Sequence, residues 1–432
     1  MGALQSTLHG QIAKVPRLAL KAILERKLKE QEIELPREGL AALLDHILNG
    51  KGEDFHWSDG NTETPDDYRS LKLVFDESDK EEIDKLIARV SQTMPGVLQK
   101  IVAEGGTQLF SALRAGWEVH EAIQRHECDE FKNRLEDRWG EGLSLLRMLL
   151  QSVREVGADV HRRHRKSKSK KHVQRRFVLG RLHIRACQVA DEIITLMENG
   201  FADGAMARWR TLHEIGVIAT IIEDGDEALA RRYIDHDIVE VKKQADDYNE
   251  NLVPLGHEQI ATRARTRIEK SYAEALQRYG PSFRHDYGWA AEHFKDKKPN
   301  FRKLQAAANR SSMSTYYKLA NFNVHAGARA MFFRLSDMGS DIPIAGRSNA
   351  GLVEPGQNTA YALVQITGAL VGHPKDLDRL VEMNSLIAMR DAIPIAFHKA
   401  DRKLRRDEVA RQRQQKRSAA ERRVKRSQIA RG

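Results

Sequence analysis

Apolar residues recur three or four positions apart along most of the chain, which is the spacing of amphipathic helices. Phe131, Leu135 and Trp139 begin one such stripe, which is typical of a helix packed on a core. A short apolar run at residues 71–75 predicts one strand. Helices are predicted within residues 1–50, 80–90, 97–160, 182–198, 203–222, 227–248, 257–278, 310–335, 358–371 and 375–400. The pattern predicts a mostly α protein, a multi-helix bundle with long loops.

Two neighbouring predicted helices, joined near residue 200, carry ionisable residues inside an apolar pattern. Arg185 and Glu192 fall on the apolar face of the first helix. Arg210, His213 and Glu214 share one face of the second, because they stand at positions i, i+3 and i+4. An isolated buried ion is very costly. We therefore expect Glu192 or Glu214 to form a salt bridge with Arg185 or Arg210.

Two interpretations of these residues remain open. In the first, they form a structural ion-pair network that fixes how the two helices pack. In the second, they form a polar site at the bundle centre, and Trp209, Tyr317 and Asn323 line it. A fully paired network would favour the first interpretation. His213 and His325 within hydrogen-bond reach in an open pocket would favour the second.

The motifs of several common enzyme classes do not occur in the sequence. There is no phosphate-binding glycine loop, no dinucleotide-binding glycine pattern and no nucleophile elbow. There is also no His-Glu-x-x-His helix and no Cys-x-x-Cys pair. We therefore expect neither a metal site nor a cofactor.

One enzymatic alternative needs no metal. Ribonucleases of the HEPN superfamily use an arginine followed a few residues later by a histidine, which can stabilise phosphate charge and move a proton. Arg208 to His213 and Arg231 to His236 have this spacing, although such pairs are frequent in a chain rich in Arg and His. The alternative assigns catalysis to Arg210, His213, Glu214, His236 and His325.

Positive charge is concentrated in two segments of a chain whose formal net charge is +10. Residues 161–176 hold 9 Lys or Arg and no acidic residue, and residues 399–432 hold 14 Lys or Arg against 4 Asp or Glu. The remainder of the chain is therefore net negative. Basic blocks of this kind indicate contact with a polyanion, so RNA or DNA is the expected partner of both segments.

Large apolar residues become too sparse to pack a core after Leu404. The segment favours helix by composition, while its like charges favour fraying, so a helical and a disordered extension both remain open. The candidate nucleic-acid-binding residues are Arg402, Lys403, Arg405, Arg406, Arg411, Arg413, Lys416, Arg417, Arg422, Arg423, Lys425 and Arg426.

The chain also resembles a family of uncharacterised, all-helical bacterial proteins that bear a domain of unknown function. The resemblance covers roughly residues 125–335 and implies the fold and the location of the site, but no chemistry. It rests on the segments that contain Arg185, Glu192, Trp209, Arg210, Leu212, Glu214, Tyr317 and His325.

Four parts are predicted: an N-terminal helical region at 1–160, a basic linker or helix start at 161–176, a central helical bundle at 177–398 and a basic tail at 399–432. No run of about 18 apolar residues is present, so we expect no membrane span. Two cysteines cannot build a disulfide framework, which favours the cytoplasm.

We expect a bacterial cytoplasmic protein associated with nucleic acid, such as a defence or stress effector. The alternatives are the metal-independent ribonuclease described above and a scaffold whose ion pairs only specify packing.

Overall fold

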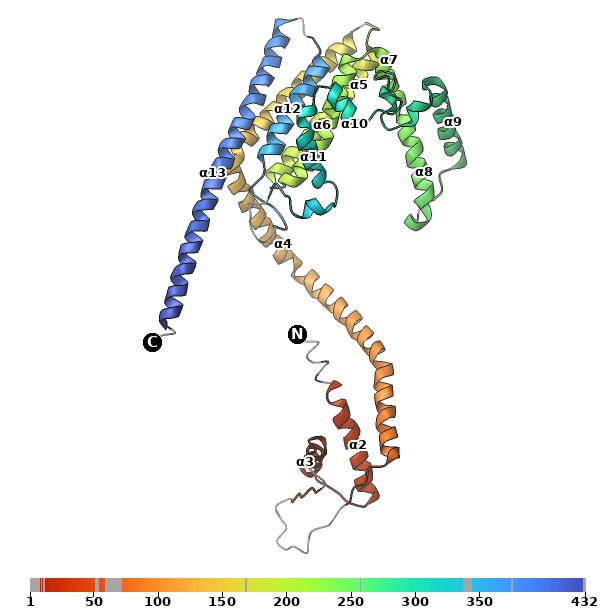
Figure 1. Cartoon of the computed structure of the whole chain (residues 1–432), viewed down its shortest axis with the longest axis vertical. Coiled ribbons are helices and arrows are strands. Elements are labelled where there is room, and N and C mark those ends of the chain that lie inside the picture. The colour runs from red at the N-terminus through yellow and green to blue at the C-terminus, as the bar shows by residue number, and fades with distance from the viewer. Residues whose placement is uncertain are drawn as a thin grey trace. The chain divides into compact units, whose positions relative to one another are not determined.

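The computed structural model describes residues 8, 10, 12–50, 54–58, 72–167, 169–256, 258–336, 344–373 and 376–429, without the side chains of 252–255, 419–420 and 422–429 (Figure 1). Every regular element in these ranges is an α-helix or a short 3-10 helix, which confirms the predicted fold class. The strand predicted at 71–75 is wrong for residues 72–75, which have no regular structure. The described residues contain no other strand that could share backbone hydrogen bonds with this stretch.

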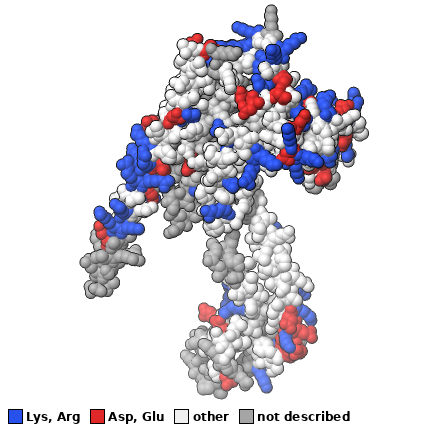
Figure 2. Space-filling model, turned by 45° about the horizontal axis from the view of Figure 1, so that its top comes forward, with Lys and Arg blue, Asp and Glu red and all other residues white. Residues whose placement is uncertain are grey.

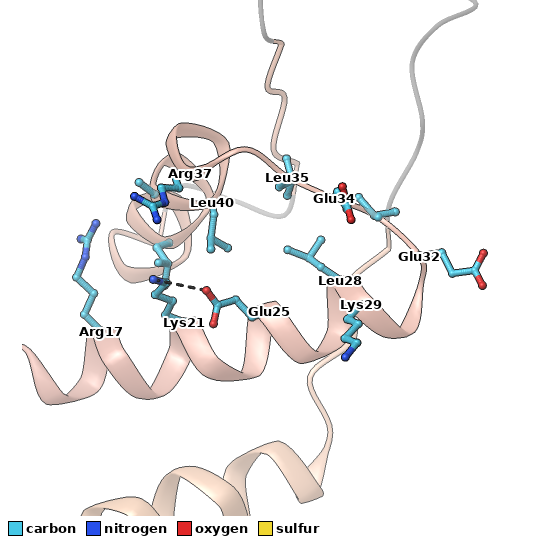
Figure 3. Close-up of a pocket in the computed structure, with 13 residues that line it drawn as sticks. Arg17, Lys21, Glu25, Leu28, Lys29, Glu32, Glu34, Leu35, Arg37 and Leu40 are labelled. Carbon is cyan, nitrogen blue, oxygen red and sulfur yellow. Dashed lines mark ion pairs between the residues drawn. The ribbon is translucent and has the colours of Figure 1, made fainter.

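The chain divides into two compact units, Met1–Ile123 and Gln124–Gly432. The first contains α2 (Val15–Glu30), α3 (Arg37–Leu48) and the beginning of α4 (Glu77–Lys166). Leu24 of α2 and Leu43 of α3 are buried against each other in a small apolar cluster. A polar-rimmed hollow of about 900 Å³ lies between these helices, with Lys21 and Glu25 paired at its edge (Figure 3).

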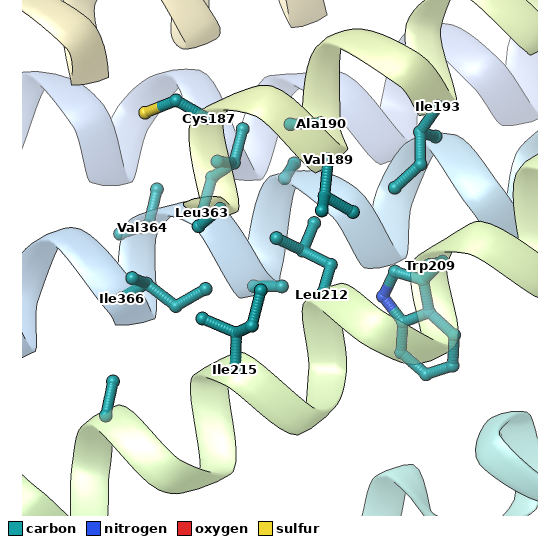
Figure 4. Packing of buried hydrophobic residues seen from close by; sticks show 14 of the residues in the cluster. Cys187, Val189, Ala190, Ile193, Trp209, Leu212, Ile215, Leu363, Val364 and Ile366 are labelled. Atoms are coloured by element: carbon teal, nitrogen blue, oxygen red, sulfur yellow. The ribbon is translucent and has the colours of Figure 1, made fainter. Parts of the chain in front are cut away.

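The second unit is a helical bundle whose members lie side by side in Figure 1. Its long helices are the later part of α4, α5 (Val173–Glu198), α6 (Ala202–Asp224), α12 (Val353–Val371) and α13 (Leu377–Ile429). Val189 of α5, Leu212 of α6 and Leu363 of α12 interdigitate in the core (Figure 4). The same core contains Leu135 and Trp139 of α4, which are almost fully buried.

This packing places the division between the units upstream of the boundary predicted at residue 160. Residues 124–160 of α4 belong to the bundle, because their apolar stripe is buried in its core. Within the basic segment, residues 161–166 end α4, residues 171–172 form a turn and residues 173–176 begin α5.

Shorter elements follow α6 along the chain. They are α7 (Glu227–Asp235), α8 (Asp237–Leu255), α9 (Thr262–Tyr279), η2 (Pro281–Arg284), η3 (Gly288–Ala290), α10 (Phe301–Ala307), η4 (Ser311–Met313), α11 (Ser314–Phe322) and η5 (Ala328–Met331). Of these, α10 and α11 contact α6 directly. The single helix predicted within 310–335 is wrong, since α11 ends at Phe322 and the tight turn bonds of Asn323 and Val324 redirect the chain.

The turn between α5 and α6 is the one predicted at residue 200. Gly200 has a φ of +75°, in the left-handed region that glycine adopts without steric cost. A Cβ atom there would also lie 2.6 Å from the ring of Phe131, so both the backbone and the packing require glycine. None of the described helices has the length and apolar content needed to cross a membrane.

Candidate functional site

A polar cluster lies where α6 faces α10 and α11. Arg210 and Glu214 stand one helical turn apart on α6, and α11 places Tyr317 and Asn321 opposite them. Glu214 Oε1 lies 3.2 Å from Arg210 Nη2. Arg210 Nε donates a 2.8 Å hydrogen bond to Asn321 Oδ1. The predicted salt bridge between Arg210 and Glu214 is therefore present.

The tyrosine completes this cluster. Tyr317 donates its hydroxyl hydrogen to Glu214 Oε1 at 2.6 Å, and the Arg210 guanidinium lies 4.7 Å from the centre of its ring. Burial, followed by the neighbouring Glu214 carboxylate, raises the pKa of Tyr317. The tyrosine therefore remains a neutral donor at physiological pH.

The cluster is not buried to the degree that the apolar pattern of α6 suggested. The side chains of Arg210 and Glu214 are 29% and 27% exposed. A partly solvated pair contributes much less to stability than a fully desolvated one, because water screens the two charges.

This exposure sets the expected cost of breaking the pair. We expect Glu214→Gln to lower the free energy of unfolding by about 1 kcal/mol, since it removes the charge but keeps an acceptor for Tyr317. Denaturant melts would measure the change, with Glu240→Gln, an exposed residue of α8, as the control. A loss of about 3–5 kcal/mol would show instead that the pair behaves as a buried one.

Glu192 and Arg185 do not join the cluster. Glu192 of α5 forms its salt bridge with Arg208 of α6. Arg185 is exposed and donates to Gln188 of its own helix at 3.1 Å. Spacing alone placed Arg185 and Glu192 on the apolar face of α5. A long arginine side chain at the edge of such a face can still extend into solvent.

His213 is packed as a neutral core residue. It is 4% exposed, and its ring lies 5.2 Å from Trp209 and 5.6 Å from Tyr317 between ring centres. Gln305 of α10 donates from Nε2 to His213 Nε2 at 3.1 Å. Burial, together with the nearby positive charge of Arg310, lowers the pKa of His213 to about 4.

The other two candidate histidines lie elsewhere. His236 is buried at the junction of α7 and α8, where its Nε2 donates to the carbonyl oxygen of His285 at 2.9 Å. Burial lowers its pKa as well. His325 is exposed beyond the end of α11. Among the described residues, no hydrogen bond joins His213, His236 and His325 to one another.

Two of the residues expected to line the site contain buried nitrogen atoms. Trp209 Nε1 and Asn323 Nδ2 have no hydrogen-bond partner within the described part of the chain. Asn323 lines a separate hollow of about 530 Å³, which also involves Asp203 and Arg334. Asp203 there accepts the backbone N–H of Leu335 at 2.8 Å, so part of its polar lining is already engaged.

The pattern analysis missed the partners that α10 and α11 supply. Gln305, Asn321 and Phe301 contact the α6 residues but lie about a hundred positions later in the chain. No periodicity on α6 carries information about them. Across the described residues, no three His, Cys, Asp or Glu side chains are placed to hold a metal ion.

The tail continues as part of α13, which runs to Ile429. Phe397 and Ala400 are buried, and Leu404 packs against the same core. Asp407 lies 2.8 Å from Arg138 of α4, and Lys399 is paired with Glu141 of α4 at 2.8 Å. The side of α13 that faces the bundle is therefore the one with Phe397, Ala400, Leu404 and Asp407.

The opposite side of α13 carries exposed cations. Residues 402, 406, 413 and 417 return to one side of a helix with 3.6 residues per turn, and Lys416 lies beside them. We call Arg402, Arg406, Arg413, Lys416 and Arg417 the basic face; all five are exposed. Figure 2 shows Lys and Arg side chains along this end of α13, at the left.

The other candidate cations of the tail lie outside the basic face. Lys403 is exposed, while Arg405 pairs with Asp401 at 2.7 Å and Arg411 with Glu408 at 2.9 Å. The side chains of four candidates lie outside the described residues, namely Arg422, Arg423, Lys425 and Arg426.

Part of the basic segment 161–176 is engaged within the bundle. Arg163 Nε lies 2.7 Å from Asp159, and Arg175 donates to the carbonyl oxygens of Glu223 and Gly225 at the end of α6. The segment lies beside the start of α13, because Arg163 also contacts Asp376 at 3.6 Å. The basic face begins more than twenty residues further along α13, so the two basic segments form separate surfaces.

Comparison with known proteins locates one domain. Residues 176–341 match the family of unknown function DUF5677, which confirms the predicted resemblance to a domain of unknown function. The match includes the cluster around Arg210 but ends before α12 and α13. No curated protein and no solved structure matches the chain.

Proposed function

We propose that the chain binds nucleic acid through the basic face of α13. The observation that carries this proposal is the segregation of charge on that helix. Asp407 of the tail pairs toward α4, whereas Arg402, Arg406, Arg413 and Arg417 point away from the bundle. No salt bridge engages these four arginines within the described residues.

A helix that presents cations along one side suits a phosphate backbone. Arg402 and Arg417 are 15 positions apart, or about 22 Å along the helix axis. Such a row can contact successive phosphates and release their condensed counterions, which supplies affinity without reading sequence. The expected partner is therefore RNA or DNA bound with little sequence preference.

The central cluster has a structural role in this proposal. His213 is neutral, buried and hydrogen bonded to Gln305, and His325 is exposed at a different place. General acid–base cleavage of RNA needs a titrating group within reach of the substrate. The cluster instead joins α6 to α10 and α11 and fixes how they pack.

Shortening the chain after Ala400 tests the proposal. The removed segment has 13 Lys or Arg and 4 Asp or Glu, and it begins directly after Ala400, the last buried core residue of α13. The shortened protein should remain folded, bind RNA and DNA more weakly, and show a shallower dependence of affinity on salt. Fluorescence anisotropy across a salt series would measure this, with thermal melts as the check on folding. Equal affinity and equal salt dependence would contradict the proposal.

A further inference from the structure

The part of α4 in the N-terminal unit carries a long row of exposed apolar side chains. Val102, Leu109 and Leu113 are 73%, 62% and 63% exposed. Monomeric soluble proteins rarely leave a contiguous apolar surface of this kind uncovered. Other large apolar side chains exposed on the same stretch are Ile87, Val97, Ile101, Phe110, Trp117, Val119 and Ile123.

Part of this surface follows a repeat along one side of the helix, which leaves out Val102, Phe110, Leu113 and Trp117. Small and apolar residues recur at steps of three or four, with three successive steps of four between Val97 and Leu109, which keeps them on one side of the helix. We call this row the α4 stripe: Ile83, Ile87, Val90, Met94, Val97, Ile101, Gly105, Leu109, Ala112, Gly116, Val119 and Ile123. The helix continues through Pro95, and the spacing is unchanged across it.

The repeat is symmetric about Ala103. Each member of the stripe before Ala103 has a counterpart at the same distance after it. An antiparallel pair of identical helices, with a twofold axis at the level of Ala103, would therefore bring every stripe position opposite another stripe position. Self-complementarity of this kind is what a twofold interface requires.

We propose that the α4 stripe is the interface of an antiparallel homodimer. In three of the six pairs the symmetry places a large side chain opposite a small one: Ile101 meets Gly105 of the second copy, Met94 meets Ala112, and Val90 meets Gly116. A Cβ atom built at Gly105 or at Gly116 would meet nothing within 4 Å, so each glycine leaves room for a partner side chain. Large residues fitting beside small ones allow two helices to approach closely.

The size of the stripe suits a stable dimer. Residues 83–123 span about 60 Å of helix. A contact strip about 10 Å wide on each helix would bury on the order of 1,200 Å² in total, at the lower end of stable interfaces.

The oligomeric state of the full-length chain tests this interface. We expect light scattering after size-exclusion chromatography to give a dimer at micromolar concentration. Ile101→Glu places a charge opposite Gly105 of the second copy and should weaken dimerisation at least about tenfold. Thr107→Glu is the matched control, because Thr107 lies on the opposite side of the helix and should leave the dimer intact. A monomeric wild-type protein, or equal weakening by both variants, would overturn the proposal.

Cross-linking distinguishes the orientation of the helices. In a Cys128→Ser background, a mixture of Ile87→Cys and Val119→Cys chains should form a disulfide between copies under mild oxidation. Neither variant alone should do so, because 32 residues of helix, about 48 Å, would separate its two identical cysteines. Cross-linking of Ile87→Cys alone would show a parallel pair and contradict the antiparallel proposal.

Discussion

Acidification from pH 7 to about pH 4 is expected to lower the free energy of unfolding of the bundle by several kcal/mol. The cause is a pair of histidines buried in their neutral form. His183 and His213 are each 4% exposed, and burial lowers the pKa of each from 6.5 to about 4. A shift of this size corresponds to about 3 kcal/mol for each residue.

The direction and the pH window follow from linkage. In the unfolded chain these imidazoles bind protons near pH 6.5, while in the folded bundle they bind them only near pH 4. The unfolded state therefore holds more protons between these values, and stability falls as the pH falls. The stability that the two neutral histidines contribute is fully present above their unfolded pKa of 6.5. It is lost once the pH has fallen to their folded pKa of about 4. Asp79 and Asp159, whose pKa values are lowered, lose their contributions below this window.

Packing around His183 explains why it cannot be protonated without cost. Its Nε2 is 3.3 Å from Thr367 Oγ1, and a Cβ atom at Gly157 would lie 2.4 Å from its ring. Because Gly157 of α4 has no side chain, the imidazole of His183 can pack directly against this helix. Burial of the ring disfavours the imidazolium form, because a charged group loses its hydration there.

Denaturant melts between pH 7 and pH 4 would measure the effect. The double variant His183→Gln and His213→Gln should lose most of the slope of stability against pH within this range. The exposed His293→Gln serves as the control and should retain the slope of the wild type. An unchanged slope in the double variant would show that the two histidines are not the source.

Local features of the fold were predictable from sequence, whereas contacts between distant segments were not. The repeat of Leu135 and Trp139 predicted a core helix, and the spacing of Arg210 and Glu214 predicted their salt bridge, because both depend only on helical geometry. The contact of Glu214 with Tyr317 spans 103 positions and depends on how α11 packs. Periodicity along one helix does not contain that information.

The histidines also show that sequence spacing does not predict contacts between distant segments. Arg-then-His spacing selected His213 and His236, yet both are buried and hydrogen bonded as structural residues. His325 was selected from a resemblance and is exposed. Spacing identifies residues that share a face but does not indicate which faces meet, and so it could not show which partners these rings have.

Replacing four arginines of the basic face is expected to weaken nucleic-acid binding on the order of a thousandfold at 0.1 M salt. The variant changes Arg402, Arg406, Arg413 and Arg417 to Ala. If each contacts one phosphate, their removal abolishes the release of about four counterions. Alanine preserves helix propensity, and these side chains point away from the core, so the fold should be unaffected.

A matched variant separates the location of charge from its amount. Arg263, Arg265, Arg267 and Lys270 are exposed on α9, and their replacement by Ala removes the same net charge. This second variant should retain most of the affinity, because long-range attraction is largely screened beyond the Debye length, about 10 Å at 0.1 M salt.

The slope of log affinity against log salt concentration tests the central claim most directly. It would be measured by fluorescence anisotropy for the wild type and both variants on the same labelled duplex. The α13 variant should have a slope shallower by about 3 to 4 than that of the wild type, while the α9 variant should keep the wild-type slope. Equal slopes for the wild type and the α13 variant would show that the basic face does not contact the phosphate backbone.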